Sequence, residues 1–346
     1  MSTLITKAPG KMIFLTGASG VVGQALLAKM DPRSVICLTR QTPLSVPGVT
    51  TVAGDISLPR FGWSSEQWAD IAARIDCIVH AAAITDFHKP EAKIMRANVH
   101  SLENVFELAA AAKAPLYHFS TAFVRPTRAA ATEDELAYAL SKREGERLVR
   151  ESGLPAVILR PSIVIGDSAS GVIARFQGFH SILGGVLDGF LPIVPASRNA
   201  FIDCIPQDVV AEVTLALIAE GRIGGEYWIT SGERALTTTR ICEILEKFMA
   251  GLGCAFTTPR FVTPDMVQRL LRPVFLPALP IPMQKRFDRL FKISTYLLIE
   301  DMFPSSLPEL STRLDLSPFP DLDEAVLRGL GYWANASGFG RRRAAA

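Results

Sequence analysis

The sequence lacks the cysteine pattern of a disulfide-stapled or zinc-binding protein. Its five cysteines stand at positions 37, 77, 204, 242 and 254, and no two are separated by only two residues. An odd number of scattered cysteines argues against a disulfide framework and a zinc site, and it is typical of a reducing compartment. We therefore expect free thiols and a cytoplasmic location.

Long apolar runs are also missing. No stretch reaches about 18 consecutive apolar residues, the length that a membrane-spanning helix needs. The N-terminal stretch MSTLITKAPGKMIFLTG has no apolar region that ends at a small-residue cleavage site. We therefore expect neither a signal peptide nor a transmembrane span.

Neither a strong charge of one sign nor a metal-ligand pattern is present. The formal net charge is +2, and the one run of like charge, Arg341–Arg343, is expected to be a frayed tail. We expect no nucleic-acid partner. The histidines at 80, 88, 100, 118 and 180 have no ligand spacing, so we expect no metal site. His80 and His118 are expected to be packed and hydrogen-bonded at strand ends.

Short apolar runs alternate with amphipathic stretches over residues 12–160. The runs read MIFLT, SVICLT, VTTVAG, CIVHAAA, PLYHFST and PAVILRP. This alternation is typical of βαβ units on a parallel sheet. It predicts an α/β fold, a Rossmann-type doubly wound parallel sheet, with ligands at the carboxyl ends of the strands.

The pattern changes after Pro161, where glycine and turn signals become frequent. At this chain length we expect about two lobes. We predict a dinucleotide-binding domain over residues 1–165, to which residues 201–232 return. Residues 166–200 and 233–346 are predicted to form a smaller, mostly helical C-terminal substrate lobe.

The segment TGASGVVG, residues 16–23, follows the first predicted strand and opens a predicted helix. Gly17 is expected to permit a tight turn, Gly20 to let a pyrophosphate approach, and Gly23 to let the helix pack closely on the sheet. The helix start offers free N–H groups to phosphates. The alternative is a helix-start turn without a ligand. The predicted cofactor contacts here are Thr16, Gly17, Ser19, Gly20, Val21, Val22 and Gly23.

The second predicted strand ends in CLTR, with an arginine where an NAD site usually has an acidic residue. Arg40 favours the 2′-phosphate of NADPH, because its guanidinium is planar and always charged. The alternative is a solvated arginine. Asp55 and Ile56, after the third strand, are expected near the adenine, although Asp55 could equally cap a turn.

The segment YALSK places Tyr138 four residues before Lys142, so on a helix the two share a face. Tyrosine has an ordinary pKa of about 10, and a neighbouring cation lowers it. We therefore expect Lys142 to lower the pKa of Tyr138, and Tyr138 to donate a proton. The alternative is an ordinary surface pair.

Together these motifs resemble the extended short-chain dehydrogenase/reductases, in the fatty acyl-CoA reductase and thioester reductase branch with a male-sterility-like NAD-binding domain. The resemblance spans roughly residues 10–230. It is carried by TGASGVVG, GDISLPRFGWSSEQWADIAARIDCIVHAAAITDF, NVHSLENVFELA, HFSTAFV, YALSK, LPAVILRPSIVIGDSASG and FIDCIPQDVV. The stretch from GDIS to AAAITDF is the most specific to the acyl-thioester branch.

The resemblance implies roles for individual residues. Thr121, with Ser120 as the close alternative, would offer a hydroxyl to the substrate carbonyl beside the proton donor Tyr138. Lys142 would also bind the nicotinamide ribose, and Asn98 would support an active-site water and the helix geometry. Further implied cofactor contacts are Ala81, Ala82, Ala83, Asn98, Lys142, Pro161 and Ser162.

The implied activity is NADPH-dependent reduction of an acyl thioester, bound to CoA or an acyl carrier protein, to an aldehyde. The sequence leaves open whether a second round continues to an alcohol. Two alternatives remain. One is another extended short-chain dehydrogenase, such as a hydroxysteroid-type dehydrogenase or a nucleotide-sugar epimerase or dehydratase. The other is a non-catalytic NADP(H) sensor. Both a monomer and a homodimer are compatible with the sequence.

Two later segments bear on the substrate. Residues 172–194 mix apolar side chains with glycines, which suits the lining of a slot beside the nicotinamide. Residues 260–303 are apolar and basic together. They are interpreted as an acyl-pocket lid, a peripheral membrane-surface helix, a basic dock for an acidic carrier, or an ordinary helical subdomain.

Overall fold

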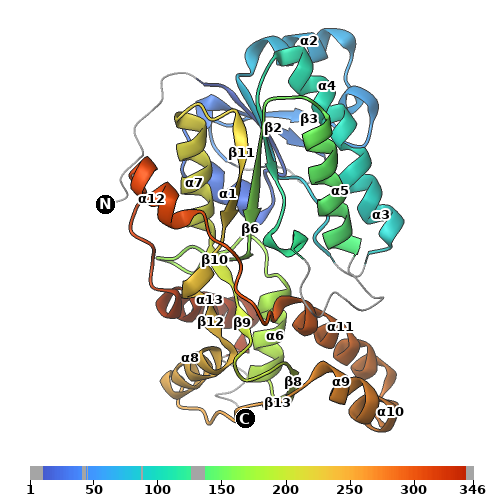
Figure 1. The fold of residues 1–346 in the computed structure, drawn as a ribbon, viewed down its shortest axis with the longest axis vertical. Helices are drawn as coiled ribbons and strands as arrows, with labels where there is room; N and C mark the ends of the chain where they lie inside the picture. The colour runs from blue at the N-terminus through green and yellow to red at the C-terminus, as the bar shows by residue number, and fades with distance from the viewer. Residues whose placement is uncertain (1–10, 41–43, 45, 87–88, 126–136, 340–346) are drawn as a thin grey trace.

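The computed structural model describes residues 11–40, 44, 46–86, 89–125 and 137–339 (Figure 1). His88 and the predicted tail Arg341–Arg343 lie outside these residues. Within the described ranges, no helix is both long enough and apolar enough to cross a membrane.

A seven-stranded parallel sheet forms the centre of the upper lobe. Its strand order is β11-β6-β5-β4-β1-β2-β3, and the neighbours pair in parallel. The order reverses between β1 and β4, which is where ligands bind in such sheets. The predicted doubly wound parallel fold is confirmed. The strands are β1 Ile13–Thr16, β2 Val35–Thr39, β3 Thr50–Ala53, β4 Cys77–His80, β5 Leu116–Phe119, β6 Ala156–Pro161 and β11 Gly224–Ile229.

Helices cover both faces of this sheet (Figure 1). The helices on one face are α2 Ser65–Arg74, α3 Glu91–Met95, α4 Leu102–Ala112 and α5 Ala137–Glu151. On the other face, α1 Val21–Leu27 packs against α7 Gln207–Ala219. Two buried apolar clusters, one on each side of the sheet, hold these layers together. The chain after the first six strands thus returns to the nucleotide-binding lobe through α7 and β11, while the exact domain limits remain a prediction.

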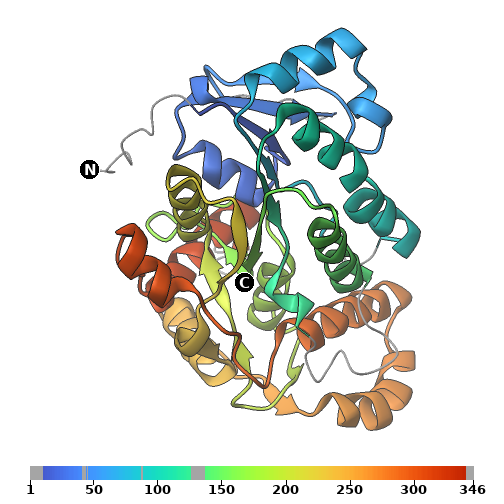
Figure 2. The same ribbon diagram turned by 45° about the horizontal axis from the view of Figure 1, so that its top comes forward.

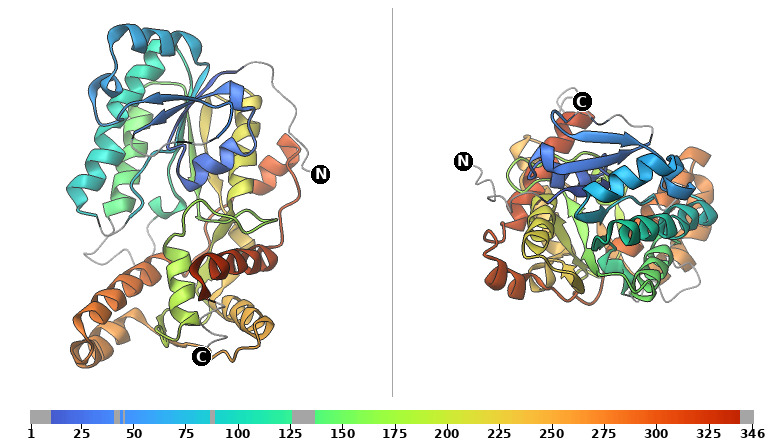
Figure 3. Two further views of the ribbon diagram at one scale, coloured as in Figure 1. Left: turned by 180° about the vertical axis from the view of Figure 1, so that it is seen from behind. Right: turned by 90° about the horizontal axis from the view of Figure 1, so that it is seen from above.

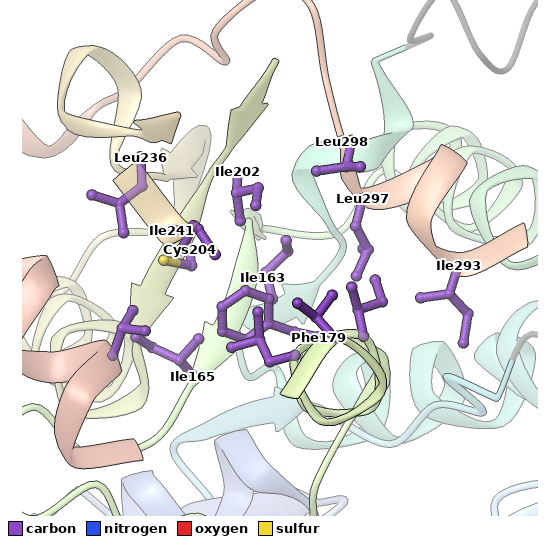
Figure 4. Close-up of a cluster of buried hydrophobic side chains, with 14 of the residues drawn as sticks. Ile163, Ile165, Phe179, Ile202, Cys204, Leu236, Ile241, Ile293, Leu297 and Leu298 are labelled. Carbon is purple, nitrogen blue, oxygen red and sulfur yellow. The ribbon is translucent and has the colours of Figure 1, made fainter. Parts of the chain in front are cut away.

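The C-terminal lobe is mostly helical and has its own apolar core (Figures 3 and 4). Short strand pairs, β13 Arg260–Val262 with β8 Ile193–Pro195 and β12 Leu236–Thr237 with β9 Phe201–Ile202, tie it together. A further pair, β10 Cys204–Pro206 with β7 Ile163–Ile165, leads from β6 into this lobe. Its helices are α6 Gly178–Leu187, α8 Thr238–Gly251, α9 Pro264–Met266, α10 Arg272–Phe275, α11 Ile281–Leu297 and α13 Leu322–Ser337; α12 Leu307–Leu314 packs back on α7.

The glycines of α6 mark close packing rather than a loop. A Cβ on Gly184 would lie 2.7 Å from the Trp333 side chain, and one on Gly185 would lie 3.1 Å from Leu191. Glycine lowers helix propensity, so the segment looked loop-like in sequence. Here the missing side chains let α13 and the turn after α6 approach the helix.

Candidate active site

Three side chains predicted to be catalytic meet at the carboxyl ends of β5 and β6. Thr121 follows β5 and is buried, and a hydrogen bond joins its hydroxyl to that of Tyr138 on α5. Lys142, one turn further along α5, donates from Nζ to the carbonyl of Phe119 at 2.7 Å. Ser120 is also buried, but no described group bonds its hydroxyl. The geometry therefore favours Thr121 over Ser120 as the partner of Tyr138.

Burial dominates the protonation of this group. It raises the pKa of Tyr138 to about 12, which outweighs the opposite effect of the hydrogen bond from Thr121. It lowers the pKa of Lys142 to about 8, although Glu146 opposes this shift. The expectation that Lys142 lowers the pKa of Tyr138 is wrong for this structure, because the ammonium points to the carbonyl of Phe119. At neutral pH the tyrosine is a neutral phenol, which is the form that can donate a proton.

Asn98 links α5, the helix that carries Tyr138 and Lys142, to the loop after β4 by hydrogen bonds. It lies in a π-helical turn, Arg96–His100, between α3 and α4. Its Oδ1 accepts from the Ile84 N–H at 2.8 Å, and its Nδ2 donates to the Ile84 carbonyl at 3.1 Å and to the Ser141 hydroxyl at 3.0 Å. Ser141 is fully buried and donates to the Tyr138 carbonyl at 2.7 Å. Sequence reasoning missed Ser141, although a polar residue inside YALSK was the signal.

The glycine turn has the backbone that a phosphate-binding turn requires. Gly17 has a φ of 76°, and a Cβ there would lie 2.6 Å from the Ala81 carbonyl carbon and the Ala82 nitrogen. Ser19 and Gly20 are exposed at the start of α1. These residues fit a pyrophosphate, because the backbone lies open where a side chain is absent.

The close approach at Gly23 differs from the prediction. A Cβ there would lie 2.3 Å from the Gly17 carbonyl oxygen, so the helix packs on the turn itself rather than on the sheet.

Other predicted cofactor residues lie along the same edge of the sheet. The Thr16 hydroxyl pairs with His80 Nδ1 at 2.8 Å and accepts from the Ala82 N–H at 3.3 Å. Pro161 ends β6, and Ser162 after it is buried. Val21 is buried and Val22 half-buried at the start of α1, and the loop after β4 supplies half-buried Ala81, Ala82 and Ala83.

Arg40 and Asp55 form an ion pair at the end of β2 and β3. The guanidinium and the carboxylate are 3.6 Å apart, and the Arg40 side chain is 65% exposed. Burial raises the pKa of Asp55, but hydrogen bonds from Ser57 and the charge of Arg40 together hold it below its ordinary value. Asp55 thus caps a turn as well as pairing with Arg40. The neighbouring carbonyl of Ile56 accepts from Asn104 at 2.9 Å.

Two histidines stack near Lys142. The rings of His80 and His118 are 5.6 Å apart and nearly parallel. Burial and the nearby Lys142 lower the pKa of His80 to about 3 and that of His118 well below its ordinary value. His80 is hydrogen-bonded as predicted. The prediction is wrong for His118, since neither ring nitrogen has a partner in the described part of the chain.

A buried ionic network that the sequence did not suggest anchors α5 to the sheet. Arg160 on β6 donates through Nε and Nη2 to the two oxygens of Glu146, each at 2.7 Å. Its guanidinium also pairs with Glu226 on β11 and lies 4.7 Å from the Trp228 ring centre. Arg150 joins both carboxylates. Only Glu146 and Arg150 stand at i and i+4 on one helix; the other partners come from β6 and β11, and no sequence spacing predicts their pairing.

The C-terminal segments differ from their predicted roles. The apolar side chains of α6 enter the core of the lobe, where Phe179 belongs to the same buried cluster as Ile163, Ile202 and Leu297 (Figure 4). The predicted slot lining by residues 172–194 is therefore largely lobe core. The inner face of α11 is also core, and it buries Leu290, Phe291, Ile293, Ser294, Tyr296 and Leu297.

Several cations of the basic segment are already paired. Arg269 pairs with Asp265 at 2.8 Å, Arg272 with Asp288 at 3.0 Å, and Arg286 with Asp188 at 3.5 Å. These pairs weaken the interpretation of residues 260–303 as a basic dock. The same segment also has exposed apolar side chains, which are Met266 on α9, Val274 on α10, and Ile281 and Met283 on α11.

A cavity of about 730 Å³ lies elsewhere in the molecule. It is bounded by the turn at Ser231–Leu236 and by the segment from Ser305 to Asp323. None of the predicted cofactor or catalytic residues lines it. Its exposed Arg234 stacks on Phe319, with the guanidinium carbon 4.9 Å from the ring centre.

The parallel sheet, the glycine turn and the Tyr-Lys helix define the class of short-chain dehydrogenase/reductases. The family model described as "Male sterility protein" matches residues 43–214. The chain belongs to the extended short-chain dehydrogenase/reductases with this NAD-binding domain, an oxidoreductase family.

This chain is similar to biosynthetic reductase domains and to a putative fatty acyl-CoA reductase. The terminal R domain from the myxalamid PKS-NRPS pathway superposes with a TM-score of 0.77 at 23% identity, covering 96% of this chain and 93% of that one. The hybrid PKS-NRPS synthetase gkaA of Penicillium citrinum is 29% identical over 69% of this chain, and the chain spans 7% of that protein. The putative fatty acyl-CoA reductase CG8303 of Drosophila melanogaster is 25% identical over 60% of this chain and 51% of its own length.

Proposed function

We propose that this protein is an NADPH-dependent reductase that converts an acyl thioester to an aldehyde, with Tyr138 as the proton donor. The observation that carries the proposal is the hydrogen-bonded pair of Thr121 and Tyr138 beside Lys142, at the same sheet edge as the glycine turn. The second observation is the family, which contains thioester reductase domains and fatty acyl-CoA reductases.

The two hydroxyls suit a carbonyl oxygen that gains negative charge. When bound, the nicotinamide supplies a hydride to the carbonyl carbon. Thr121 and Tyr138 donate hydrogen bonds to the oxygen, and Tyr138 passes its proton to it. The product is a hemithioacetal, which loses a thiol to give an aldehyde. If the aldehyde stays bound, a second molecule of NADPH would supply the hydride and the same two hydroxyls would assist its reduction to an alcohol.

The remaining predicted residues bind and orient the cofactor in this proposal. The turn from Thr16 to Gly23 holds the pyrophosphate, and Arg40 binds the 2′-phosphate that distinguishes NADPH from NADH. Lys142 binds the nicotinamide ribose, and Pro161 lines the nicotinamide pocket. The exposure of Arg40 supports this role, because its guanidinium can turn toward a phosphate by giving up a solvent-screened pair with Asp55.

For the substrate we propose a thioester on phosphopantetheine, either CoA or an acyl carrier protein, with an apolar acyl chain. The support is that similar reductase domains occur in multidomain synthetases, one of them beside a thiolation domain. A thiolation-reductase di-domain from an archaeal non-ribosomal peptide synthetase shares the fold, with a TM-score of 0.69 at 17% identity. The nonribosomal peptide synthetase asaC of Aspergillus flavus is 27% identical over 59% of this chain and 24% of its own length.

The test is NADPH oxidation with a panel of acyl-CoA and acyl-carrier thioesters. Thiol release and product mass are scored together, because the proposal requires one thiol and one aldehyde or alcohol for each thioester consumed. We expect turnover of at least one thioester with an apolar chain. If only a ketone, a sterol or a nucleotide sugar is turned over, the proposed substrate class is wrong. If NADPH binds and no carbonyl compound reacts, the result favours the alternative that the protein is a non-catalytic NADP(H) sensor.

A further inference from the structure

An aromatic side chain of the C-terminal lobe lies directly against the catalytic turn. Tyr296 on α11 is 6% exposed, and its ring stacks on that of Phe123 with the ring centres 4.7 Å apart. Phe123 stands two residues after Thr121, in the short 3₁₀ turn Ala122–Val124. Figure 2 shows α11 beside the turn that follows β5. The lobe that carries Tyr296 therefore contacts the end of β5.

The catalytic tyrosine shares this environment. Tyr138 packs against the same apolar cluster that contains Phe123 and Tyr296. Burial first, and then the nearby phenol of Tyr138, raise the pKa of Tyr296, while Arg143 acts in the opposite direction. The two tyrosines are thus electrostatic neighbours, and both are neutral at physiological pH.

A backbone hydrogen bond also connects Phe123 to Thr121. The Phe123 N–H donates to the Thr121 hydroxyl oxygen at 3.4 Å, which caps the turn. The Phe303 ring contacts the Phe123 ring edge-on, with the ring centres 5.2 Å apart. It also stacks on the Trp228 ring, with the ring centres 6.4 Å apart. Phe123 is therefore held between α11 and the segment that follows it. Phe123 thus contacts Tyr296 through its ring and Thr121 through its backbone N–H.

We propose that Tyr296 is a positioning residue of the active site: its ring fixes Phe123 and thereby aims the Thr121 hydroxyl at the substrate carbonyl. This inference rests on the proposed function, in which Thr121 and Tyr138 bind that oxygen. It gives the C-terminal lobe a direct part in transition-state alignment, besides any contact with the acyl chain.

The test compares a loss of the ring with a loss of the hydroxyl. Tyr296→Leu removes the stacked ring, Tyr296→Phe keeps it, and Phe291→Leu is the matched control. Phe291 lies on the same helix, is 8% exposed and stacks on Phe287, away from the catalytic turn. Loss of one donor to a developing oxyanion lowers kcat by about 10²–10³-fold, so a misaimed donor should cost about tenfold or more.

We expect Tyr296→Leu to lower kcat by about tenfold or more, while Tyr296→Phe and Phe291→Leu stay within about threefold. The dissociation constant of NADPH should be unchanged in all three, which also reports that each variant is folded. Equal losses in Tyr296→Leu and Phe291→Leu would overturn the proposal.

A double-mutant cycle separates positioning from general destabilisation. If Tyr296 acts through Thr121, the variant carrying both Tyr296→Leu and Thr121→Ala should be no slower than Thr121→Ala alone. Losses that add would mean that Tyr296 acts independently of Thr121, against the proposal.

A readout without substrate keeps this inference apart from the proposed function. The methyl resonance of Thr121, assigned by its loss in Thr121→Ala, should shift in Tyr296→Leu and stay in place in Phe291→Leu. If the wild-type protein reduces no thioester, the proposed function is wrong, and the Thr121 resonance still decides whether Tyr296 holds the turn. An unmoved resonance in Tyr296→Leu would overturn the positioning role.

Discussion

Lys142 is a charged side chain that the fold buries at a cost. Its pKa is about 8 in the folded protein, against 10.5 for an unperturbed lysine. The unfolded chain therefore binds this proton more tightly. The resulting destabilisation is fully present below pH 8 and disappears as the pH rises through 10.5. A residue that costs stability at neutral pH and sits beside Tyr138 has the profile of a functional group rather than a structural one.

We therefore predict that Lys142→Met abolishes turnover yet stabilises the protein at pH 7, by up to about 3 kcal/mol, since one pKa unit is worth about 1.36 kcal/mol. The gain over wild type should shrink between pH 8 and pH 10.5. Urea unfolding at pH 7 and pH 10 measures it, with the exposed Lys93→Met as control. A variant that is less stable than wild type at pH 7 would refute this argument.

Arg40 is predicted to select the cofactor. Hydrogen bonds to charged groups contribute about 1.5–3 kcal/mol, so loss of a guanidinium–phosphate pair should weaken binding about tenfold or more. Arg40→Ala should therefore raise the dissociation constant of NADPH at least about tenfold and leave that of NADH nearly unchanged. Fluorescence titration with both cofactors measures this. An equal loss for the two would place Arg40 outside the phosphate site.

At the scale of elements, a partly buried ion cluster holds α5, the helix that carries Tyr138 and Lys142. The Arg160 and Glu146 side chains are 7% and 4% exposed, and Glu226 has a pKa of about 2 because Arg150 and Arg160 outweigh its partial burial. Removing one partner of a buried ion pair leaves the other charge uncompensated. The cluster thus links the position of Tyr138 and Lys142 to β6 and β11.

We predict that Arg160→Met lowers the free energy of unfolding by about 3–5 kcal/mol. Arg147→Met is the control, because Arg147 on α5 is 50% exposed and pairs with Glu144 and Glu151 at the surface. It should cost about 1 kcal/mol or less. Urea denaturation of both variants is the measurement, and equal losses would show that the buried cluster does not anchor α5.

The strands and most helices of the nucleotide-binding lobe were predictable because their signals are local. Each strand is a short apolar run between turn residues. The start of α2 is marked in the sequence by Ser64, whose hydroxyl accepts from the Gln67 N–H at 3.2 Å. Features that depend on distant partners were not predictable. Gly184 of α6 looked like a loop residue, because the Trp333 ring that packs beside it lies about 150 positions away in the sequence.

In the predicted site, too, local features were predictable and features that depend on distant partners were not. The spacing of Tyr138 and Lys142 predicted a shared helix face, and the structure gathers both with Thr121. The direction of the Lys142 side chain depends on the Phe119 carbonyl of a neighbouring strand, which spacing cannot reveal. The roles of the individual cofactor and catalytic residues remain predictions.

At the scale of the whole molecule, a close backbone contact joins the loop after β7 to α13 near the C-terminal end of the chain. Gly171 lies between β7 and α6, and a Cβ there would lie 2.3 Å from the carbonyl carbon of Arg328 on α13. The Arg328 guanidinium donates to the Ser168 carbonyl at 2.7 Å in the same place. The loop after β7 can therefore accept no side chain without moving α13.

We predict that Gly171→Ala destabilises the protein by about 1–3 kcal/mol more than Gly153→Ala. The two glycines have similar φ angles, 71° and 68°, so the strain of a side chain in the left-handed region is matched. They differ in surroundings, because nothing lies within 4 Å of a Cβ on Gly153. Thermal unfolding compares them, and equal shifts in Tm would mean that α13 yields freely.

The central claim is that hydride reaches a thioester carbonyl at Tyr138. It is tested most directly with NADPH carrying deuterium at the transferred position and an acyl thioester, with the product analysed by mass spectrometry. For the wild-type protein we predict an aldehyde or alcohol that contains the deuterium, together with one free thiol. Tyr138→Phe should bind NADPH normally and form this product about 10²–10⁴-fold more slowly. A Tyr138→Phe variant within a few-fold of the wild-type rate, or a product without deuterium, would contradict the account.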